Sequence, residues 1–212
     1  MKALDLYCGA GGASKGLAEA GFEVTGIDIY PQPRYPFAFR QADVRKLRAR
    51  DLESFDLVWA SPPCQFATAY ARRPDHVVPA LNLILGTRSL LEAGGAPYVI
   101  ENVPGARTHL CQPFTLCGSM FGLDVRRHRL FETSFEVGLV PPCDHGRQAP
   151  RFPQATNRCN PRSTVEVGVW RIPLETQQKA MGGCEWMSRE ELSQAIPPAY
   201  ARWIAERFLE RY

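Results

Sequence analysis

Two short segments carry side chains suited to covalent and acid–base chemistry. One is Ser61-Pro62-Pro63-Cys64-Gln65, in which two prolines stiffen the backbone, remove two amide donors and hold the thiol in one direction. The other, Glu101-Asn102-Val103, supplies a carboxyl after an apolar run. A thiol paired with a carboxyl is the pattern of nucleophilic catalysis with proton transfer. We therefore predict that Cys64 and Glu101 converge, whereas a structural cysteine would more often sit inside an apolar run.

A glycine-rich turn, Gly9-Ala10-Gly11-Gly12, follows the first apolar segment. Such a turn lets backbone N–H groups approach a ligand, and the next helix adds its positive end. Alone, it fits a plain tight turn equally well. Asp28 is placed to accept from a ribose hydroxyl and Asp43 from an adenine amino group. Capping of a turn or helix is the common alternative role for both carboxylates.

The elements that must position these residues alternate between strands and helices. The spacing predicts strands over 3–7, 22–27, 37–43, 55–60 and 98–100, and helices over 14–20 and 77–93. This order indicates a parallel α/β sheet, whose ligands bind beyond the carboxyl ends of the strands. The candidate polar residues lie at or just beyond these ends, which indicates an enzyme: Asp5, Asp28, Asp43, Cys64 and Glu101.

The second half of the chain is organised differently. Residues 134–175 are rich in proline, glycine, cysteine and arginine, which indicates a loop-rich insert. Ser188 and Glu191 have capping-box spacing, and Pro197-Pro198 interrupts the helix before 200–212. We predict a catalytic domain over 1–133, an insert over 134–175 and a C-terminal helical segment over 176–212.

Composition limits the class of protein. With 212 residues and 45% hydrophobic content, the chain can bury one principal core. It has no apolar run long enough for a membrane span and no signal-peptide pattern, so we expect no membrane partner and a cytoplasmic location. The net charge is only +3, but the second half is rich in arginine, which favours recognition of phosphates and bases.

The seven cysteines do not form the dense pattern of a disulfide scaffold. Cys8 reads as a packing residue, Cys111 and Cys117 as core, and His76, His109 and His128 as surface or structural residues. Zinc could be held by Cys143, His145 and Cys159, with Cys184 as a fourth ligand. Because these residues form no CxxC pair, we expect a metal-free insert instead.

Together the motifs resemble those of the cytosine-5 DNA methyltransferases. Asp5-Leu6-Tyr7-Cys8-Gly9-Ala10-Gly11-Gly12 resembles the cofactor motif of that family, Pro62-Pro63-Cys64-Gln65 its nucleophile motif, and Glu101-Asn102-Val103 its acid motif. Arg127-His128-Arg129 is similar to its paired-arginine strand, and Gln194-Ala195-Ile196-Pro197-Pro198 to its closing motif. Two features depart from the family: Val125 replaces a usual glutamine, and the recognition segment is short.

The resemblance implies a Rossmann-like class I S-adenosylmethionine-dependent methyltransferase fold with a small loop-rich insert. It implies S-adenosyl-L-methionine as cofactor and double-stranded DNA as partner, with the target cytosine flipped out of the helix. Cys64 would attack C6 of the base, Glu101 would hold a proton at N3 through a raised pKa, and Arg129 would contact O2. Arg127 would support that strand or a phosphate, and Asn102 belongs to the same catalytic set.

The resemblance also implies two groups of binding residues. The cofactor group is Asp5, Tyr7, Cys8, Gly9, Ala10, Gly11, Asp28, Ile29, Asp43, Val44 and Pro62. The substrate group is Ser61, Pro63, Gln65, Arg72 and Arg73, where the two arginines would face phosphate from a mobile loop or simply form a solvated surface.

Three alternatives remain at this point: a tRNA cytosine-5 methyltransferase, a catalytically silent DNA-binding relative, and transfer of a modified methyl group from an S-adenosylmethionine analogue. The sequence also leaves open the target site, the choice between monomer and homodimer, and a role in a phage or a restriction system.

Overall fold

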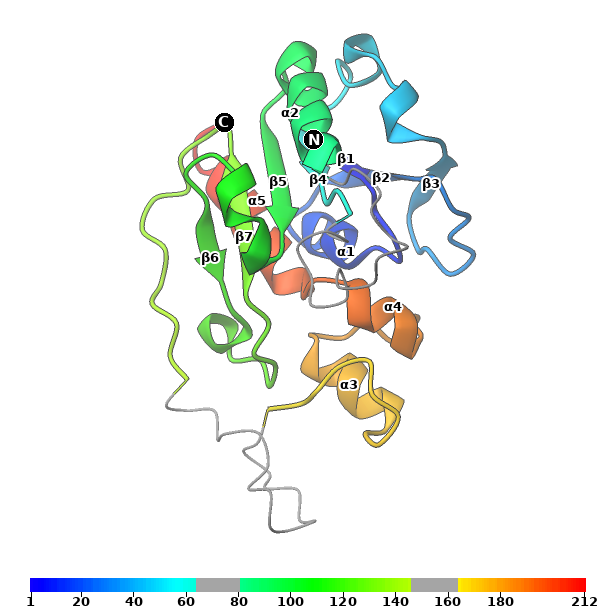
Figure 1. The fold of residues 1–212 in the computed structure, drawn as a ribbon, viewed down its shortest axis with the longest axis vertical. Helices are drawn as coiled ribbons and strands as arrows, with labels where there is room; N and C mark the ends of the chain where they lie inside the picture. The colour runs from blue at the N-terminus through cyan, green and yellow to red at the C-terminus, as the bar shows by residue number, and fades with distance from the viewer. Residues whose placement is uncertain (64–80, 146–163) are drawn as a thin grey trace.

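The computed structural model describes residues 1–63, 81–145 and 164–212 (Figure 1). Across these ranges the strands form one sheet in the order β3-β2-β1-β4-β5-β7-β6. The strands are β1 Lys2–Leu6, β2 Glu23–Asp28, β3 Ala38–Gln41, β4 Leu57–Ala60, β5 Tyr98–Asn102, β6 Phe114–Leu116 and β7 Arg129–Thr133. The α-helices are α1 Gly12–Glu19, α2 Leu81–Gly94, α3 Leu174–Ala180, α4 Arg189–Gln194 and α5 Pro198–Leu209. Short 3₁₀ turns are η1 Val44–Lys46, η2 Ala49–Asp51, η4 Pro104–His109 and η5 Gly118–Phe121.

Strands β1 to β5 pair in parallel, as the alternation of elements predicts. Strand β7 runs antiparallel to both β5 and β6, so a hairpin completes one edge of the sheet. The predicted Rossmann-like α/β class is therefore confirmed. The short strand β6 was not predicted, because three residues following Pro113 carry too little alternation to reveal a strand.

Helices cover both faces of the sheet. Within β4, Leu57 and Trp59 face a core that contains Tyr200 of α5, while Val58 and Ala60 face a second core that contains Ile84 of α2. A strand buried on both faces reads as a continuous apolar run, which is why β4 is evident from sequence. Figure 1 also shows α3 and α4 beyond the end of the sheet toward which β5 points.

Two glycines let the C-terminal segment lie directly against α1. A Cβ atom at Gly12 would be 2.5 Å from the carbonyl oxygen of Ile196, and one at Gly16 would be 2.1 Å from that of Pro198. Since real Cβ contacts are never this short, any larger residue would push the two segments apart. The closing motif at 194–198 therefore packs on the helix behind the glycine-rich turn.

The C-terminal helices follow their local signals. Ser188 caps α4 by accepting from the Glu191 amide, and the Glu191 carboxylate accepts from the Ser188 amide at 2.7 Å, which confirms the capping box. Helix α5 begins at Pro198 rather than at residue 200, because proline suits the first turn of a helix. Of the helix predicted over 77–93, residues 77–80 lie outside the described ranges and the rest is α2.

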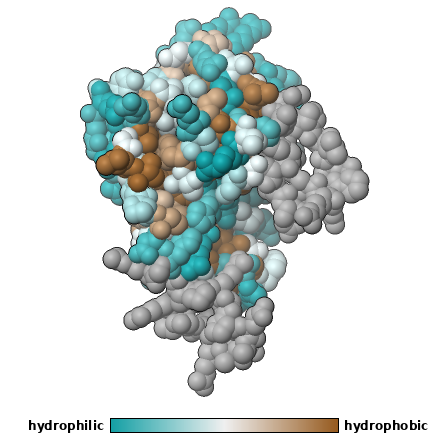
Figure 2. Space-filling model, turned by 60° about the vertical axis from the view of Figure 1, so that its left-hand side comes forward, coloured by the Kyte–Doolittle hydropathy of each residue, from teal (hydrophilic) through white to brown (hydrophobic). Residues whose placement is uncertain are grey.

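The described surface on the β6 side mixes small hydrophobic patches with hydrophilic side chains (Figure 2). Among the described residues, no helix combines the length and the apolar character needed to cross a membrane. Cys117 is buried, as predicted for a core residue, but the prediction for Cys111 is wrong because this side chain is exposed. It lies in the turn between η4 and β6, outside the apolar clusters.

Candidate functional site

The candidate site lies at the carboxyl ends of β1, β2, β4 and β5, where the sequence predicts it. Asp28 and Asn102 are the last residues of β2 and β5, and Ser61 follows β4 directly. Four predicted residues lie outside the described ranges: Cys64, Gln65, Arg72 and Arg73. The convergence of Cys64 with Glu101 therefore remains a prediction.

The centre of the site is an ion pair between neighbouring strands. Nε of Arg129, the first residue of β7, lies 3.1 Å from Oε1 of Glu101 in β5. Only 7% of Glu101 is exposed. Burial raises the pKa of Glu101, and the effect exceeds the opposing influence of Arg129, a Ser61 hydrogen bond and Arg127. The site thus holds a carboxyl that takes up a proton more readily than one in water.

The segment before Cys64 is attached to the acid motif. The Asn102 side-chain amide donates to the carbonyl oxygen of Pro62 at 3.0 Å, and its own oxygen accepts from the Val103 amide. The Trp59 indole N–H donates to the Ser61 hydroxyl at 3.1 Å. Pro62 is buried and Pro63 is exposed. The structure therefore places residues 61–63 next to Glu101 and Asn102.

Arg127 connects the site to the C-terminal segment. Its guanidinium donates to the carbonyl oxygen of Ser193 in α4, and its own carbonyl accepts from the Tyr200 hydroxyl at 2.7 Å. These contacts attach the segment before β7 to α4 and α5, and the role of Arg127 in supporting that strand or a phosphate stays a prediction. Val125, at the position where the family usually has glutamine, is buried in an apolar cluster with Ala10 and Met181.

The glycine-rich turn has an unusual backbone. Tyr7, Gly9 and Gly11 have φ angles of 58°, 49° and 90°, in the left-handed region that glycine adopts readily and tyrosine does not. The Tyr7 hydroxyl lies 2.9 Å from the Thr87 hydroxyl of α2, which anchors the strained residue. The turn therefore has a defined left-handed backbone conformation at the edge of the sheet, and α1 begins directly after Gly11.

Asp5 lies beneath this turn and is fully buried. The Ser14 hydroxyl donates to Oδ2 of Asp5 at 2.5 Å and lies 2.6 Å from the Tyr35 hydroxyl. Oδ1 has no hydrogen-bond partner among the described residues. Burial is the largest influence on Asp5 and raises its pKa to about 7. Through Ser14, Asp5 therefore connects β1 to α1, the two elements on either side of the turn.

Asp28 adopts the capping geometry that was the alternative interpretation. Oδ2 accepts from the Gly9 amide at 3.0 Å and Oδ1 from the Tyr30 amide at 2.9 Å. Each oxygen has a second lone pair for a ligand donor. Ile29, the next residue, has 46% of its surface exposed. The carboxylate thus joins the turn to the end of β2, beside an accessible aliphatic side chain.

Asp43 also caps, at the start of η1. Its carboxylate accepts from the Arg45 amide at 3.0 Å and pairs with the Arg45 guanidinium at 2.8 Å. The hydrogen bond from the Arg45 side chain is the largest cause of a lowered pKa for Asp43. Val44 is buried. Asp43 lies just past the end of β3, in the predicted place, with its strongest contact to Arg45.

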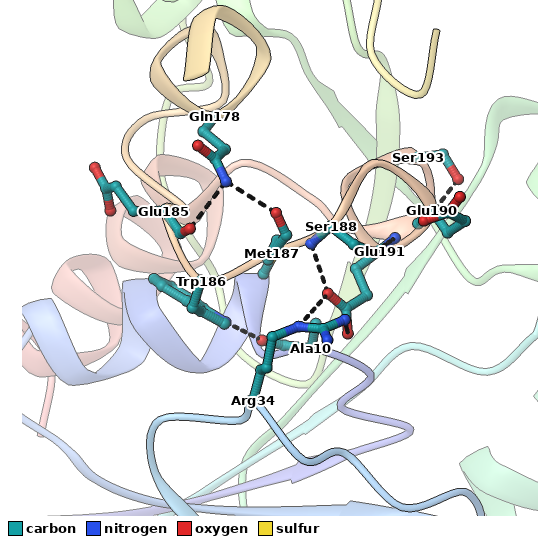
Figure 3. A network of polar contacts seen from close by, with 10 residues as sticks. All are labelled: Ala10, Arg34, Gln178, Glu185, Trp186, Met187, Ser188, Glu190, Glu191 and Ser193. Atoms are coloured by element: carbon teal, nitrogen blue, oxygen red, sulfur yellow. Dashed lines mark hydrogen bonds and ion pairs between the residues drawn. The ribbon is translucent and has the colours of Figure 1, made fainter. Parts of the chain in front are cut away.

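Several contacts that no sequence motif predicts hold the turn from the C-terminal side (Figure 3). The Trp186 indole N–H donates to the carbonyl oxygen of Ala10 at 2.7 Å. Arg34 forms a 2.8 Å ion pair with the capping residue Glu191. The Gln178 side chain donates to the carbonyl oxygens of Glu185 and Met187 and fixes the loop that presents Trp186.

Two cysteine predictions can be compared with the structure. Cys8 is buried, and burial raises the pKa of its thiol well above the usual range, as suits a neutral packing residue. Cys184 is buried in the apolar cluster that contains Met181 and Met187. Of the residues considered for the alternative zinc site, Cys159 lies outside the described ranges, and Cys184 is not among the described side chains that cluster with Cys143 and His145.

Comparison with known proteins agrees with these features. Residues 1–113 match the model of the C-5 cytosine-specific DNA methylase family. The type II methyltransferase M.AgeI of Thalassovita gelatinovora is 26% identical over 62% of this chain and 38% of its own length. M.HgiDI of Herpetosiphon aurantiacus is 31% identical over 50% of this chain and 38% of its own length. The chain therefore spans less than half the length of either relative.

Solved structures match the fold over almost the whole chain. A protein encoded within an E. coli prophage, described as a DNA modification methyltransferase, has a TM-score of 0.70 at 13% identity and covers 99% of both chains. The S. pombe Dnmt2 methyltransferase has a TM-score of 0.67 at 15% identity, over 99% of this chain and 98% of its own. At such low sequence identities, these matches show a shared fold and carry no conclusion about function.

Proposed function

The chain belongs to the C-5 cytosine-specific DNA methylase family, and from this membership we propose that it is a DNA cytosine C5-methyltransferase. It would transfer a methyl group from S-adenosyl-L-methionine to a flipped cytosine through a covalent bond between Cys64 and C6 of the base. The observation that carries this proposal is the buried Glu101 carboxyl, whose pKa is raised and which is held by Arg129 beside the segment that leads to Cys64.

The Glu101 carboxyl would limit the negative charge that nucleophilic attack places on the cytosine ring. Attack of the Cys64 thiolate on C6 pushes electrons into the ring, and a proton at N3 prevents charge from accumulating there. A carboxyl that is easily protonated can hold that proton, and the cause of its raised pKa is burial. The guanidinium of Arg129, which contacts Glu101, would donate to O2 of the base.

The remaining steps return the enzyme to its starting state. Addition at C6 makes C5 an enamine carbon, and C5 forms the new bond to the methyl group. Loss of the C5 proton to solvent then restores the double bond as the C6–S bond breaks and Cys64 leaves as thiolate. Asn102 fixes Pro62 and so positions the segment before the nucleophile.

The residues around the glycine-rich turn fit S-adenosylmethionine. Asp28 retains acceptor capacity for ribose hydroxyls, and the exposed Ile29 offers an apolar surface for adenine. Asp43 would accept from the adenine amino group. Bound S-adenosylmethionine supplies an electrophilic methyl group on a sulfonium centre. The left-handed backbone at Gly9 and Gly11 brings main-chain groups close to such a ligand.

Trapping on DNA that contains 5-fluorocytosine tests the proposal. Fluorine at C5 cannot leave as a proton, so Cys64 would remain bonded to C6 after methyl transfer. With the cofactor and a random-sequence duplex library, the wild-type protein should give a denaturation-resistant adduct. Cys64→Ser should give none, while Cys111→Ser, which changes an exposed cysteine, should react as the wild type does. A folded wild-type protein without an adduct would contradict the proposal.

The same assay separates the alternatives. A tRNA substrate carrying 5-fluorocytidine should give no adduct if DNA is the substrate, and adducts on tRNA alone would identify a tRNA methyltransferase. A silent relative would bind DNA without an adduct on either nucleic acid. The mass added to C5 distinguishes a methyl group from a modified one.

A further inference from the structure

Four metal-ligand side chains meet at the end of the β6–β7 hairpin. The ligand atoms of Cys117, His128, Cys143 and His145 all lie within 4.8 Å of one another. Sγ of Cys143 is 2.9 Å from Nε2 of His145 and 3.4 Å from Nε2 of His128, and Sγ of Cys117 is 3.4 Å from Nε2 of His145. Both imidazoles therefore direct the same nitrogen into a group of two thiols.

The register of the hairpin explains why two of these residues meet. Leu116 pairs with Arg129 across β6 and β7, so the next antiparallel pair beyond the ladder is Cys117 with His128. Residues directly opposite one another on antiparallel strands have adjacent side chains. Residues 143–145, at the start of the predicted insert, supply the other two ligands from a separate part of the chain.

The set of ligands is suited to zinc. Zinc binds thiolate and imidazole in a tetrahedral shell, with Zn–S near 2.3 Å and Zn–N near 2.0–2.1 Å, which places sulfur and nitrogen roughly 3.5 Å apart. The two 3.4 Å distances match this value. The 2.9 Å pair would separate slightly, which the exposed Cys143 side chain permits. Magnesium and calcium prefer oxygen ligands, which this group does not offer.

We propose that Cys117, His128, Cys143 and His145 form a structural zinc site that fastens the start of the 134–175 insert to the β6–β7 hairpin. Four protein ligands fill the tetrahedral shell and leave no position for a reacting water, which is the pattern of a structural site. The ligands come from both sides of η5 and from the insert. The metal would therefore join residues 143–145 to the hairpin, a connection that the pairing of β6 with β7 does not make.

Neighbouring groups provide the outer contacts that metal sites use. The Ser119 hydroxyl lies 3.3 Å from Sγ of Cys143, where it can donate to a thiolate. The Arg126 guanidinium donates to the carbonyl oxygen of His145 at 3.3 Å and adds positive charge near two thiolates. Such contacts orient ligands and stabilise their deprotonated forms. They belong to the hairpin and the insert, so they strengthen the same connection.

The site also borders the catalytic arginine. His128 precedes Arg129, whose guanidinium donates to the His128 carbonyl at 2.9 Å. A metal that fixes His128 would thus help to hold Arg129 against Glu101. This consequence rests on the proposed function, whereas metal binding itself does not.

Metal content of the untagged full-length chain tests the site without any assay of activity. The protein is expressed with zinc in the medium, purified with a reductant and without chelator, and analysed by mass spectrometry for metals. We expect one zinc per chain in the wild type and in Cys111→Ser, and a loss of at least tenfold in Cys143→Ser. Cys111 is a matched control because it is an exposed cysteine outside the group.

A spectroscopic measurement on the wild type removes any dependence on whether the variants fold. Cobalt added to chelator-treated protein that retains its circular dichroism should give the intense visible bands of a tetrahedral thiolate site, and zinc should abolish them. A folded wild-type protein with neither zinc nor these bands would overturn the proposal. So would a Cys117–Cys143 disulfide under reducing conditions, or equal loss of zinc from Cys111→Ser.

Discussion

Nε of Arg129 lies 3.1 Å from Oε1 of Glu101, and the two residues belong to the adjacent antiparallel strands β7 and β5. Both side chains are largely buried, so little water screens their interaction. Burial nevertheless raises the pKa of Glu101 more than Arg129 lowers it. The pair therefore combines a fixed positive charge with a carboxyl that can carry a proton, next to the segment that leads to Cys64.

Replacement of Glu101 by glutamine should reduce methylation sharply. Glutamine has nearly the same shape but cannot take up and release a proton, and loss of a general acid costs about 100-fold or more. We expect kcat to fall by about that factor, while binding of S-adenosylmethionine changes little. Single-turnover methylation and calorimetric titration of the cofactor measure the two effects separately.

Glu206→Gln is the control for this change. Glu206 pairs with Arg202 on the exposed face of α5, and surface pairs contribute little to stability. It should retain wild-type activity. If Glu101→Gln were as active as Glu206→Gln, the assignment of Glu101 as the acid would be wrong.

Asp5 should make stability depend on pH near neutrality. Its pKa is raised from 3.8 to about 7 in the folded protein, so the folded state holds a proton that the unfolded chain releases. The stabilisation is complete below about pH 4 and is lost as pH rises toward about 7. At 1.36 kcal/mol per unit, the loss amounts to about 4 kcal/mol.

Asn cannot ionise, so Asp5→Asn should remove this part of the pH dependence. Urea unfolding at about pH 5 and about pH 8 gives the free energy of unfolding of each protein at both values. The wild type should lose more stability between them than the variant does, with other titrating groups common to both. Parallel losses in the two proteins would show that Asp5 does not titrate in this range.

Much of the fold could be predicted because its signals are local. Glycines and aspartates mark the ends of β1 and β2, and β4 is apolar throughout because it is buried on both faces. Asp28 lies at the end of β2 and Glu101 near the end of β5, so the edge that holds the site could be predicted as well. The capping box of Ser188 and Glu191 is equally local.

Contacts between distant segments could not be predicted in this way. Trp186 and Ala10 are separated by 176 positions, and nothing near either residue indicates the other. Cys117 and His128 share no motif; only the register of a hairpin with a three-residue strand brings them together. Cys111 lies close to Cys117 in an apolar stretch, yet one side chain is exposed and the other buried, a difference that tertiary packing decides.

Trp186→Phe should weaken cofactor binding. The change removes the indole N–H that donates to the Ala10 carbonyl at 2.7 Å, and such a bond contributes about 1 kcal/mol. The turn would then have to be ordered on binding, which should raise the Kd for S-adenosylmethionine by about fivefold. Trp170→Phe is the control, since 80% of Trp170 is exposed. Equal titration curves for the two variants would refute this role for Trp186.

Alanine substitutions at two helical glycines should have opposite effects on stability. At Gly16 a Cβ atom would lie 2.1 Å from the Pro198 carbonyl oxygen, so α1 and α5 must separate, and such overpacking costs about 1–3 kcal/mol. At Gly86, exposed in α2, a Cβ atom would meet nothing within 4 Å. There alanine should stabilise the protein by about 0.5–1 kcal/mol, because it restricts the unfolded chain.

Urea unfolding of both variants beside the wild type measures these changes. The midpoint should fall for Gly16→Ala and rise for Gly86→Ala, with the slope unchanged in each. The comparison isolates the contact of α1 with the closing segment, because both changes add one methyl group to a helix. If Gly16→Ala were as stable as Gly86→Ala, the close approach of Pro198 to α1 would not exist in solution, and the packing behind the glycine-rich turn would need another explanation.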